Sequence, residues 1–351
     1  MRERLVTNNA LRGLLYREAL RREATRLPYA PFTIYLDVCN ACNLACTFCP
    51  QSHWEGRPRG RMAWEMFERA LPQVAELKPA RLFLFRYGEA TLHDRIADMV
   101  KAAVDAGLRV RLHTNAAGLT EAKALALIEA GLQECRFSFD TADRDLYERM
   151  RVGSRFDRTV ANIRRMVELR GGARRRKPVF ELQELVPYVS GARSANTEAY
   201  RKLFQGLDVR FTAKFMHSFA GQGSEKTFAG RRAEGRSQCS QLYRRIVVNF
   251  DGKIHACCLD PFGYNVVGDL AAGDTIAAAW NSPRMAQLRE RTNRGDVRGL
   301  RPCHSCEMLT RAEPPARQGL TGVLAVTAWR WAAGGQRREQ DAPETSRRTG
   351  G

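Results

Sequence analysis

The sequence predicts an α/β fold in which six strands alternate with helices and form an open, partial (β/α)6 barrel, followed by a small cysteine-containing domain. Two features of the chain predict this fold. Short runs of β-branched and aromatic residues alternate with segments whose apolar residues recur at helical spacing. Strands that are separated by helices pair in parallel through right-handed crossovers. After residue 216 the alternation ends and a glycine-rich, charged stretch begins.

The predicted elements of the barrel follow one another in order. The strands span residues 32–38, 81–86, 108–113, 134–139, 179–186 and 209–216. The helices between them span residues 93–106, 120–130, 143–150, 156–170 and 194–205. A further helix begins near Trp64, and Pro72 is expected to bend it. In such barrels the loops at the C-terminal ends of the strands carry the chemistry, so we expect the site there.

Composition divides the chain into five parts. Residues 1–30 contain a short Arg-rich helix, and residues 31–216 form the barrel. Residues 217–237 are rich in Gly and Ser and are predicted to be a linker. Residues 238–312 form the small domain. For residues 313–351 we expect a C-terminal helix and then a disordered tail.

The charge and the cysteine content restrict the class of protein. The 57 basic and 38 acidic residues give a formal net charge of +19, which first suggests nucleic acid as a partner. The arginines are scattered over every segment, so we interpret the charge as general composition and not as a binding face. The N-terminus has no signal peptide, and no apolar stretch is long enough to span a bilayer. Ten cysteines in such a chain indicate metal or redox chemistry in the cytoplasm.

The first cysteine group lies directly after the first predicted strand. Cys42, Cys46 and Cys49 place three thiols within eight residues of one loop. A structural zinc ion normally takes four protein ligands, whereas three suit a [4Fe–4S] cluster that keeps one iron open for a small molecule. Cys39 lies nearest the strand and breaks the spacing, so we leave it out of the ligand set.

The CxxxCxxC spacing after the first strand resembles the hallmark of the radical S-adenosylmethionine (SAM) superfamily. Other motifs of that superfamily follow at the ends of later predicted strands, although Tyr87 replaces the first glycine of one motif and Ala116 stands where glycine is common in another. The resemblance implies that SAM is bound by Phe48, Gly88, Glu89, Asn115, Ser138 and Asp140. It also implies that a reduced cluster cleaves SAM into methionine and a 5′-deoxyadenosyl radical, with electrons from a flavodoxin- or ferredoxin-type donor.

The small domain contains a second cysteine group beside a predicted hairpin with an Asp251-Gly252 turn and a stretch over residues 274–292 that is predicted to be helical. The four thiols of this group belong to Cys239, Cys257, Cys303 and Cys306. Taken alone, they fit zinc as well as a cluster. Behind a radical SAM barrel they resemble the SPASM extension in its shortened "twitch" form, which implies a second, auxiliary [4Fe–4S] cluster. Cys258 is left over, either filling space or donating hydrogen to a substrate radical.

The twitch-like extension resembles that of radical SAM dehydrogenases of aminoglycoside pathways. The resemblance implies oxidation of a secondary alcohol, or an epimerisation, on a small carbohydrate or aminocyclitol. The candidate catalytic residues are Cys258, as a hydrogen donor, and Lys214 and His217, as bases at the end of the sixth strand.

Two alternatives remain open. The first is a radical SAM maturase of a ribosomal peptide, although only residues 1–30 precede the barrel. The second and more remote alternative is a zinc-binding nucleic-acid protein, which would use the same cysteines and the positive charge. It lacks a set of aromatic residues beside basic ones on which bases would stack.

Overall fold

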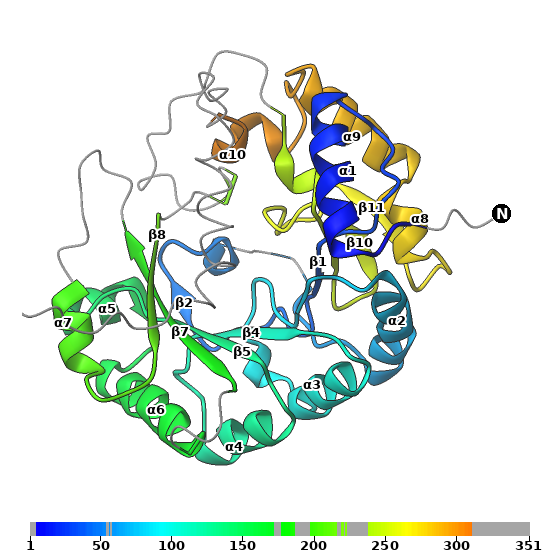
Figure 1. The fold of residues 1–351 in the computed structure, drawn as a ribbon. Coiled ribbons are helices and arrows are strands. Elements are labelled where there is room, and N and C mark those ends of the chain that lie inside the picture. The colour runs from blue at the N-terminus through cyan, green and yellow to red at the C-terminus, as the bar shows by residue number, and fades with distance from the viewer. Residues whose placement is uncertain are drawn as a thin grey trace, which may run out of the picture. The chain divides into compact units, whose positions relative to one another are not determined.

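The computed structural model describes residues 5–53, 56, 58–171, 177–186, 197–215, 219–220, 222 and 238–310. Within these ranges the predicted α/β barrel is confirmed (Figure 1). Nearly all of the predicted linker and the whole tail at 313–351 lie outside the described residues, and the prediction for them stays untested. No helix in the described ranges is both long and apolar enough to cross a bilayer.

One nine-stranded sheet carries the fold, in the order β11-β10-β9-β1-β3-β4-β5-β7-β8. Its six barrel strands are β1 (Thr33–Leu36), β3 (Arg81–Phe83), β4 (Val110–Thr114), β5 (Glu134–Ser138), β7 (Val179–Val186) and β8 (Arg210–Phe215). Neighbours among these six strands pair in parallel. Parallel pairing places all six C-terminal ends at one edge of the barrel, which is where the sequence predicted the site.

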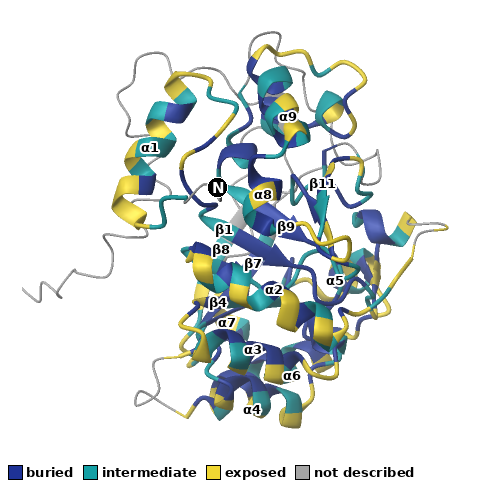
Figure 2. Ribbon diagram, turned by 90° about the vertical axis from the view of Figure 1, so that its right-hand side faces the viewer, coloured by how far each residue is buried: buried dark blue, intermediate teal, exposed yellow. Residues whose placement is uncertain are grey.

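The helices lie around the outside of the sheet (Figure 1). They are α2 (Trp64–Leu77), α3 (Ile96–Asp105), α4 (Glu121–Glu129), α5 (Arg144–Met150), α6 (Phe156–Leu169) and α7 (Thr197–Leu203). Pro72 lies inside α2 without ending it. Figure 2 shows that the sheet is largely buried and that exposed residues gather on the helices.

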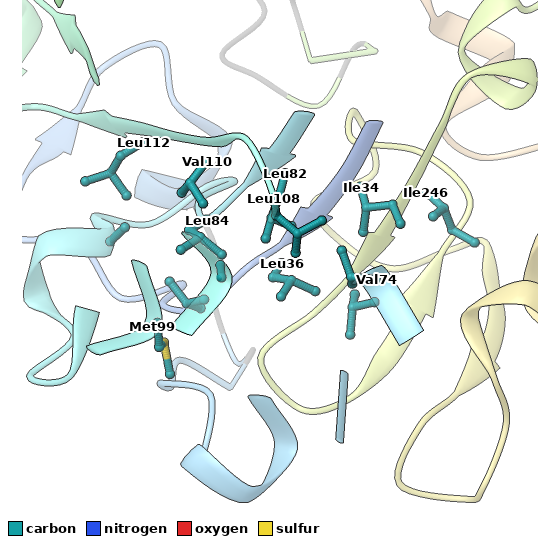
Figure 3. Close-up of a cluster of buried hydrophobic side chains, with 14 of the residues drawn as sticks. Ile34, Leu36, Val74, Leu82, Leu84, Met99, Leu108, Val110, Leu112 and Ile246 are labelled. Carbon is teal, nitrogen blue, oxygen red and sulfur yellow. The ribbon is translucent and has the colours of Figure 1, made fainter. Parts of the chain in front are cut away.

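Alternate residues of the strands pack against these helices to form the hydrophobic core (Figure 3). The strand residues Ile34, Leu36, Leu82, Val110 and Leu112 all lie buried there, as do Leu84 just after β3, Val74 of α2 and Met99 of α3. Burial of each such side chain stabilises the fold by about 1.5–3 kcal/mol. The residues between them in sequence therefore face the interior of the barrel.

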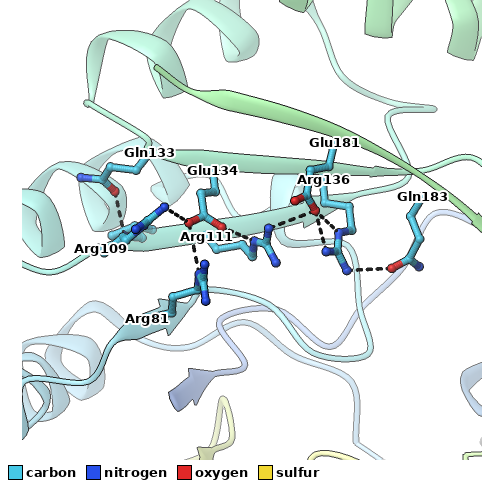
Figure 4. Close-up of polar contacts among 9 residues, drawn as sticks. Arg81, Arg109, Arg111, Gln133, Glu134, Arg136, Glu181 and Gln183 are labelled. Atoms are coloured by element: carbon cyan, nitrogen blue, oxygen red, sulfur yellow. Dashed lines mark hydrogen bonds and ion pairs between the residues drawn. The ribbon is translucent and has the colours of Figure 1, made fainter. Parts of the chain in front are cut away.

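The interior of the barrel is charged near the start of its strands (Figure 4). Glu134 of β5 contacts three arginines, at 2.6 Å from both Arg109 and Arg111 and 3.1 Å from Arg81. Burial alone would raise the pKa of Glu134, but these arginines hold it below its ordinary value. Glu181 of β7 continues the network through Arg111 and Arg136. This network lies near the N-terminal ends of the strands, so it leaves their C-terminal ends for the site.

The small domain continues the barrel sheet. Its strand β9 (Arg245–Val248) pairs in parallel with β1, and β10 (Lys253–His255) and β11 (Val266–Asp269) follow in antiparallel order. The predicted hairpin is present, and Gly252 at its turn has φ 87°, which favours glycine. The stretch 274–292, predicted to be helical, is helical over most of its length. Two helices, α8 (Ile276–Trp280) and α9 (Pro283–Asn293), occupy this stretch, because Ser282 caps α9 and Pro283 begins it.

The N-terminal helix α1 (Asn9–Arg21) is held to the barrel by a buried arginine. Arg12 is fully buried and donates to the carbonyl oxygens of Pro31 at 3.0 Å and of Lys78 at 2.7 Å. At the other end of the described chain lies the short helix α10 (Glu307–Thr310).

Candidate functional site

The first cysteine loop leaves β1 and is fixed by a small separate sheet. Strand β2 (Ala45–Cys46) pairs in antiparallel fashion with β6 (Arg151–Val152). Burial raises the pKa of Cys42 to about 11 and that of Cys49 to about 12, and negative charge on Cys46 would raise both further. The three thiols are therefore close enough to influence one another.

This donor set fits an iron–sulfur cluster. Thiols whose pKa is raised stay protonated on their own, and a strongly positive group is needed to hold these three neighbouring thiols as thiolates. Among the residues that the structure describes, no three Cys, His, Asp or Glu side chains lie close enough to hold a single metal ion. A cluster attaches each thiolate to a different iron, so its ligands stand farther apart than those of one zinc ion.

The loop after β3 packs directly beneath the first cysteine loop. A Cβ atom on Gly88 would overlap the carbonyl oxygen of Cys39 and lie 2.6 Å from that of Ala41, so only glycine fits there. Glu89 is buried, and its amide donates to the Ala41 carbonyl oxygen at 2.8 Å. Its carboxylate accepts from the amide of Asn115 at 2.7 Å.

Asn115 connects this loop to the cysteines. Its side-chain Nδ2 lies 3.7 Å from Cys42 Sγ and donates to Asn43 Oδ1 at 2.9 Å. The structure thus brings together Gly88, Glu89 and Asn115, which the sequence placed at the ends of two different strands. Their predicted role in SAM binding stays a prediction.

The sequence reasoning missed Arg151. This buried arginine donates to Asp140 Oδ2 at 2.7 Å, and its Nη1 lies 3.9 Å from Cys46 Sγ. Its guanidinium also lies 5.7 Å from the centre of the Phe48 ring. The one sequence signal that could have indicated Arg151 is Asp140 itself, because a buried aspartate needs a cation nearby. Ser138, the other predicted residue here, ends β5 opposite Gln183 of β7.

The second cysteine group gathers from three places in the small domain. Cys239 precedes a short 3₁₀ helix (Ser240–Tyr243), Cys257 follows β10, and Cys303 and Cys306 bracket another 3₁₀ turn. The pKa of Cys257 is raised by its hydrogen bond with Cys258 and by burial, and charge on Cys239 or Cys306 would raise it further. Burial raises the pKa of Cys303 to about 12, and Cys239 adds to this shift. These four thiols are therefore neighbours as well.

Cys258 has polar neighbours on the barrel side. Nη1 of Arg245 lies 3.6 Å from Cys258 Sγ and 3.5 Å from the hydroxyl oxygen of Tyr35. The hydrogen bond from Cys257, together with the charge of Arg245, lowers the pKa of Cys258. Tyr35 packs on Phe83 with ring centroids 4.6 Å apart. The thiol of Cys258 is therefore not part of an apolar core, which weakens the space-filling interpretation.

The two predicted bases stay untested. Lys214 lies on β8, paired with Leu185 of β7, but its side chain is outside the described part of the structure. His217 lies outside the described residues altogether.

Two family models match the chain. The Radical SAM superfamily matches residues 36–172, and the SPASM iron–sulfur cluster-binding domain matches residues 239–307. Both cysteine groups fall inside these matches.

Curated relatives match over shorter stretches. The chain is 32% identical over 108 residues to the tungsten-containing aldehyde ferredoxin oxidoreductase cofactor-modifying protein of Pyrococcus furiosus, covering 30% of each chain. It is 28% identical over 120 residues to the PqqA peptide cyclase of Bradyrhizobium diazoefficiens, covering 34% of this chain and 31% of that protein. The chain thus matches about a third of the length of these relatives.

Solved structures share the fold over most of the chain. BtrN in complex with AdoMet and 2-DOIA matches with a TM-score of 0.52 at 16% identity, covering 80% of this chain and 92% of that one. Streptococcus suis SuiB bound to the precursor peptide SuiA matches with a TM-score of 0.61 at 15% identity, covering 87% and 76%. At these identities the similarity establishes the fold. Radical SAM domains bind SAM and a [4Fe–4S] cluster, and SPASM domains bind auxiliary iron–sulfur clusters. Residues 36–172 thus carry a radical SAM domain, and residues 239–307 carry a SPASM iron–sulfur cluster-binding domain.

Proposed function

We propose that the protein is a radical SAM oxidoreductase that takes a hydrogen atom from a carbon of a small carbohydrate or aminocyclitol, leading to oxidation of an alcohol or to epimerisation. One observation supports this most strongly: the loop after β3 contacts both cysteine loops. Glu89 bonds the first loop, and Arg86 and Tyr87 bond the backbone of Cys257 and Cys258 in the second. Because one segment joins the two loops that would hold the redox groups, the arrangement suits a reaction that transfers single electrons.

The cysteines divide between the two proposed clusters. Cys42, Cys46 and Cys49 hold the SAM-binding cluster, and Cys239, Cys257, Cys303 and Cys306 hold one auxiliary cluster. When bound, these groups supply a 5′-deoxyadenosyl radical and an acceptor for one electron. Phe48, Gly88, Glu89, Asn115, Ser138 and Asp140 bind and orient SAM, and Arg151 keeps Asp140 in place.

The remaining chemistry belongs to side chains of this chain. In an oxidation the substrate hydroxyl must lose a proton, and Lys214 or His217 is the proposed base. In an epimerisation the substrate carbon radical must receive a hydrogen atom. Cys258 is the proposed donor, with its S–H bond broken and a C–H bond formed. An external flavodoxin- or ferredoxin-type donor then supplies the electron that restores the thiolate, which takes up a proton. A hydrogen donor must keep its S–H bond, so this role requires the protonated form of Cys258 beside Arg245.

The product distinguishes the two outcomes. We would incubate the reconstituted enzyme with 2-deoxy-scyllo-inosamine and related aminocyclitols in D2O and follow the product mass. Loss of two hydrogens indicates oxidation, and gain of one deuterium indicates epimerisation. If no aminocyclitol or sugar increases the yield of 5′-deoxyadenosine above the level without substrate, the proposed substrate class is wrong.

The second candidate is modification of a ribosomal peptide. It is favoured by the similarity to a PqqA peptide cyclase and by the fold shared with SuiB bound to its precursor peptide. A short precursor encoded beside the gene would be the test substrate. An increase in 5′-deoxyadenosine with this peptide and not with the aminocyclitols would select this candidate.

We also place the enzyme in the cytoplasm. The ten cysteines are all free thiols in the structure, and a reducing compartment keeps thiols available for clusters.

A further inference from the structure

The four residues Arg86–Glu89 form a short bridge between the two cysteine loops. On one side, Gly88 packs against the carbonyl oxygen of Cys39 and the amide of Glu89 bonds Ala41. On the other side, the side chains of Arg86 and Tyr87 reach the loop that carries Cys257.

Arg86 makes three hydrogen bonds to the auxiliary loop. Its Nη1 lies 3.0 Å from His255 Nδ1, and its Nη2 donates to the carbonyl oxygen of Cys257 at 2.9 Å and to that of Asp260. Because arginine can only donate, Nδ1 of His255 must accept, which fixes the ring tautomer. A guanidinium with this planar fork is held rigidly, and its Nη2 bonds the backbone of Cys257, a proposed cluster ligand.

Tyr87 strengthens this bridge and explains a departure from the family pattern. Its hydroxyl donates to the carbonyl oxygen of Cys258, and its ring lies 4.8 Å from the guanidinium of Arg86. The glycine that is usual at this position has no side chain and makes neither contact. The replacement therefore adds a cross-link from the SAM-binding loop to the auxiliary loop.

We propose that Arg86 is a positioning residue whose positive charge raises the reduction potential of the auxiliary cluster. This inference rests on the proposed function, which assigns that cluster to Cys257 and its three partners. A nearby cation favours the more negative, reduced state, and the effect is strong where water is excluded. Hydrogen bonds toward the ligand-bearing backbone act in the same direction. The result is a better electron acceptor. Asp37 and Asp260 are buried acids that interact with the charge of Arg86, so the measurement is made at one fixed pH.

The test uses full-length protein in which Cys42→Ala, Cys46→Ala and Cys49→Ala leave only the auxiliary site. The midpoint potential is measured by a redox titration followed by electron paramagnetic resonance. We expect Arg86→Gln and Arg86→Met to change the ratio of oxidised to reduced cluster at least tenfold at a fixed potential. For one electron this is a lowering of about 59 mV. Arg86→Lys keeps the charge and is expected to keep the potential.

Arg69→Gln is the matched control. Arg69 of α2 also bonds the small domain, with Nη1 donating to the carbonyl oxygen of Leu270 at 3.0 Å, and Leu270 is not next to a cysteine in the chain. If Arg86→Gln and Arg86→Met titrate together with Arg69→Gln, or if Arg86→Lys falls as far as Arg86→Gln, the inference is wrong while the auxiliary cluster stands. If the triple cysteine variant holds no iron, the proposed auxiliary cluster is wrong and the inference falls with it.

Discussion

The buried ion pair between Asp140 and Arg151 gives the sharpest prediction about the first site. The side chains are 1% and 6% exposed, and their polar atoms lie 2.7 Å apart. Asp140→Asn keeps the shape and a hydrogen-bond acceptor but leaves a buried guanidinium without its counter-charge. Breaking one partner of a buried pair typically costs about 3–5 kcal/mol. Because asparagine can still accept from Arg151, we expect a loss of about 3 kcal/mol.

The exposed pair of Asp157 with Arg144 is the matched control. Its side chains are 69% and 55% exposed, so Asp157→Asn should cost no more than about 1 kcal/mol. The assay is urea unfolding followed by circular dichroism, with the iron content measured in parallel. Because Arg151 also lies beside Cys46, Asp140→Asn should lower the iron content by about half by emptying the first site. Equal unfolding midpoints for the two variants would refute the reasoning.

Three further predictions concern single residues. Gly88→Ala places a methyl group against the Cys39 carbonyl oxygen, so 5′-deoxyadenosine formation should be lost while the auxiliary cluster signal remains; an active variant would contradict the fit. Cys258→Ser should abolish deuterium uptake but not 5′-deoxyadenosine formation if the enzyme is an epimerase, and uptake that persists rules out Cys258 as the donor. Burial raises the pKa of Asp37 from 3.8 to about 6, so its contribution to stability is greatest below pH 3.8 and falls by about 3 kcal/mol as the pH rises through 6. Asp37→Asn removes this fall, and the difference in unfolding free energy between wild type and variant should therefore change by about 2 kcal/mol between pH 4 and pH 7; a constant difference would contradict the shift.

The sequence was most informative where chemistry depends on neighbours in the chain. The spacing of Cys42, Cys46 and Cys49 is local, and Glu89 and Asn115 each follow their own strand, so the sequence indicated that Glu89 and Asn115 lie near the cysteine loop, as the structure shows. The binding roles of these residues stay predictions. Element ends were less certain. The second strand was predicted to reach Arg86 but ends at Phe83, because the chain must turn to bring Gly88 beneath the cysteine loop.

Contacts between distant segments could not be predicted. Arg151 reaches Asp140 only because the small β2–β6 sheet brings the start of β6 beside Cys46. Arg245 meets Tyr35 because β9 pairs with β1 across most of the length of the chain. Neither pairing leaves a pattern in the local sequence, since a lone arginine in an arginine-rich chain is not distinctive.

The central claim is that the chain holds two iron–sulfur clusters, one on three cysteines and one on four. Iron, zinc and acid-labile sulfide in anaerobically purified, full-length protein measure this directly. The account predicts about eight irons and eight sulfides per chain, falling to about four when Cys42, Cys46 and Cys49 are replaced by alanine. Protein that contains zinc and no sulfide would contradict it.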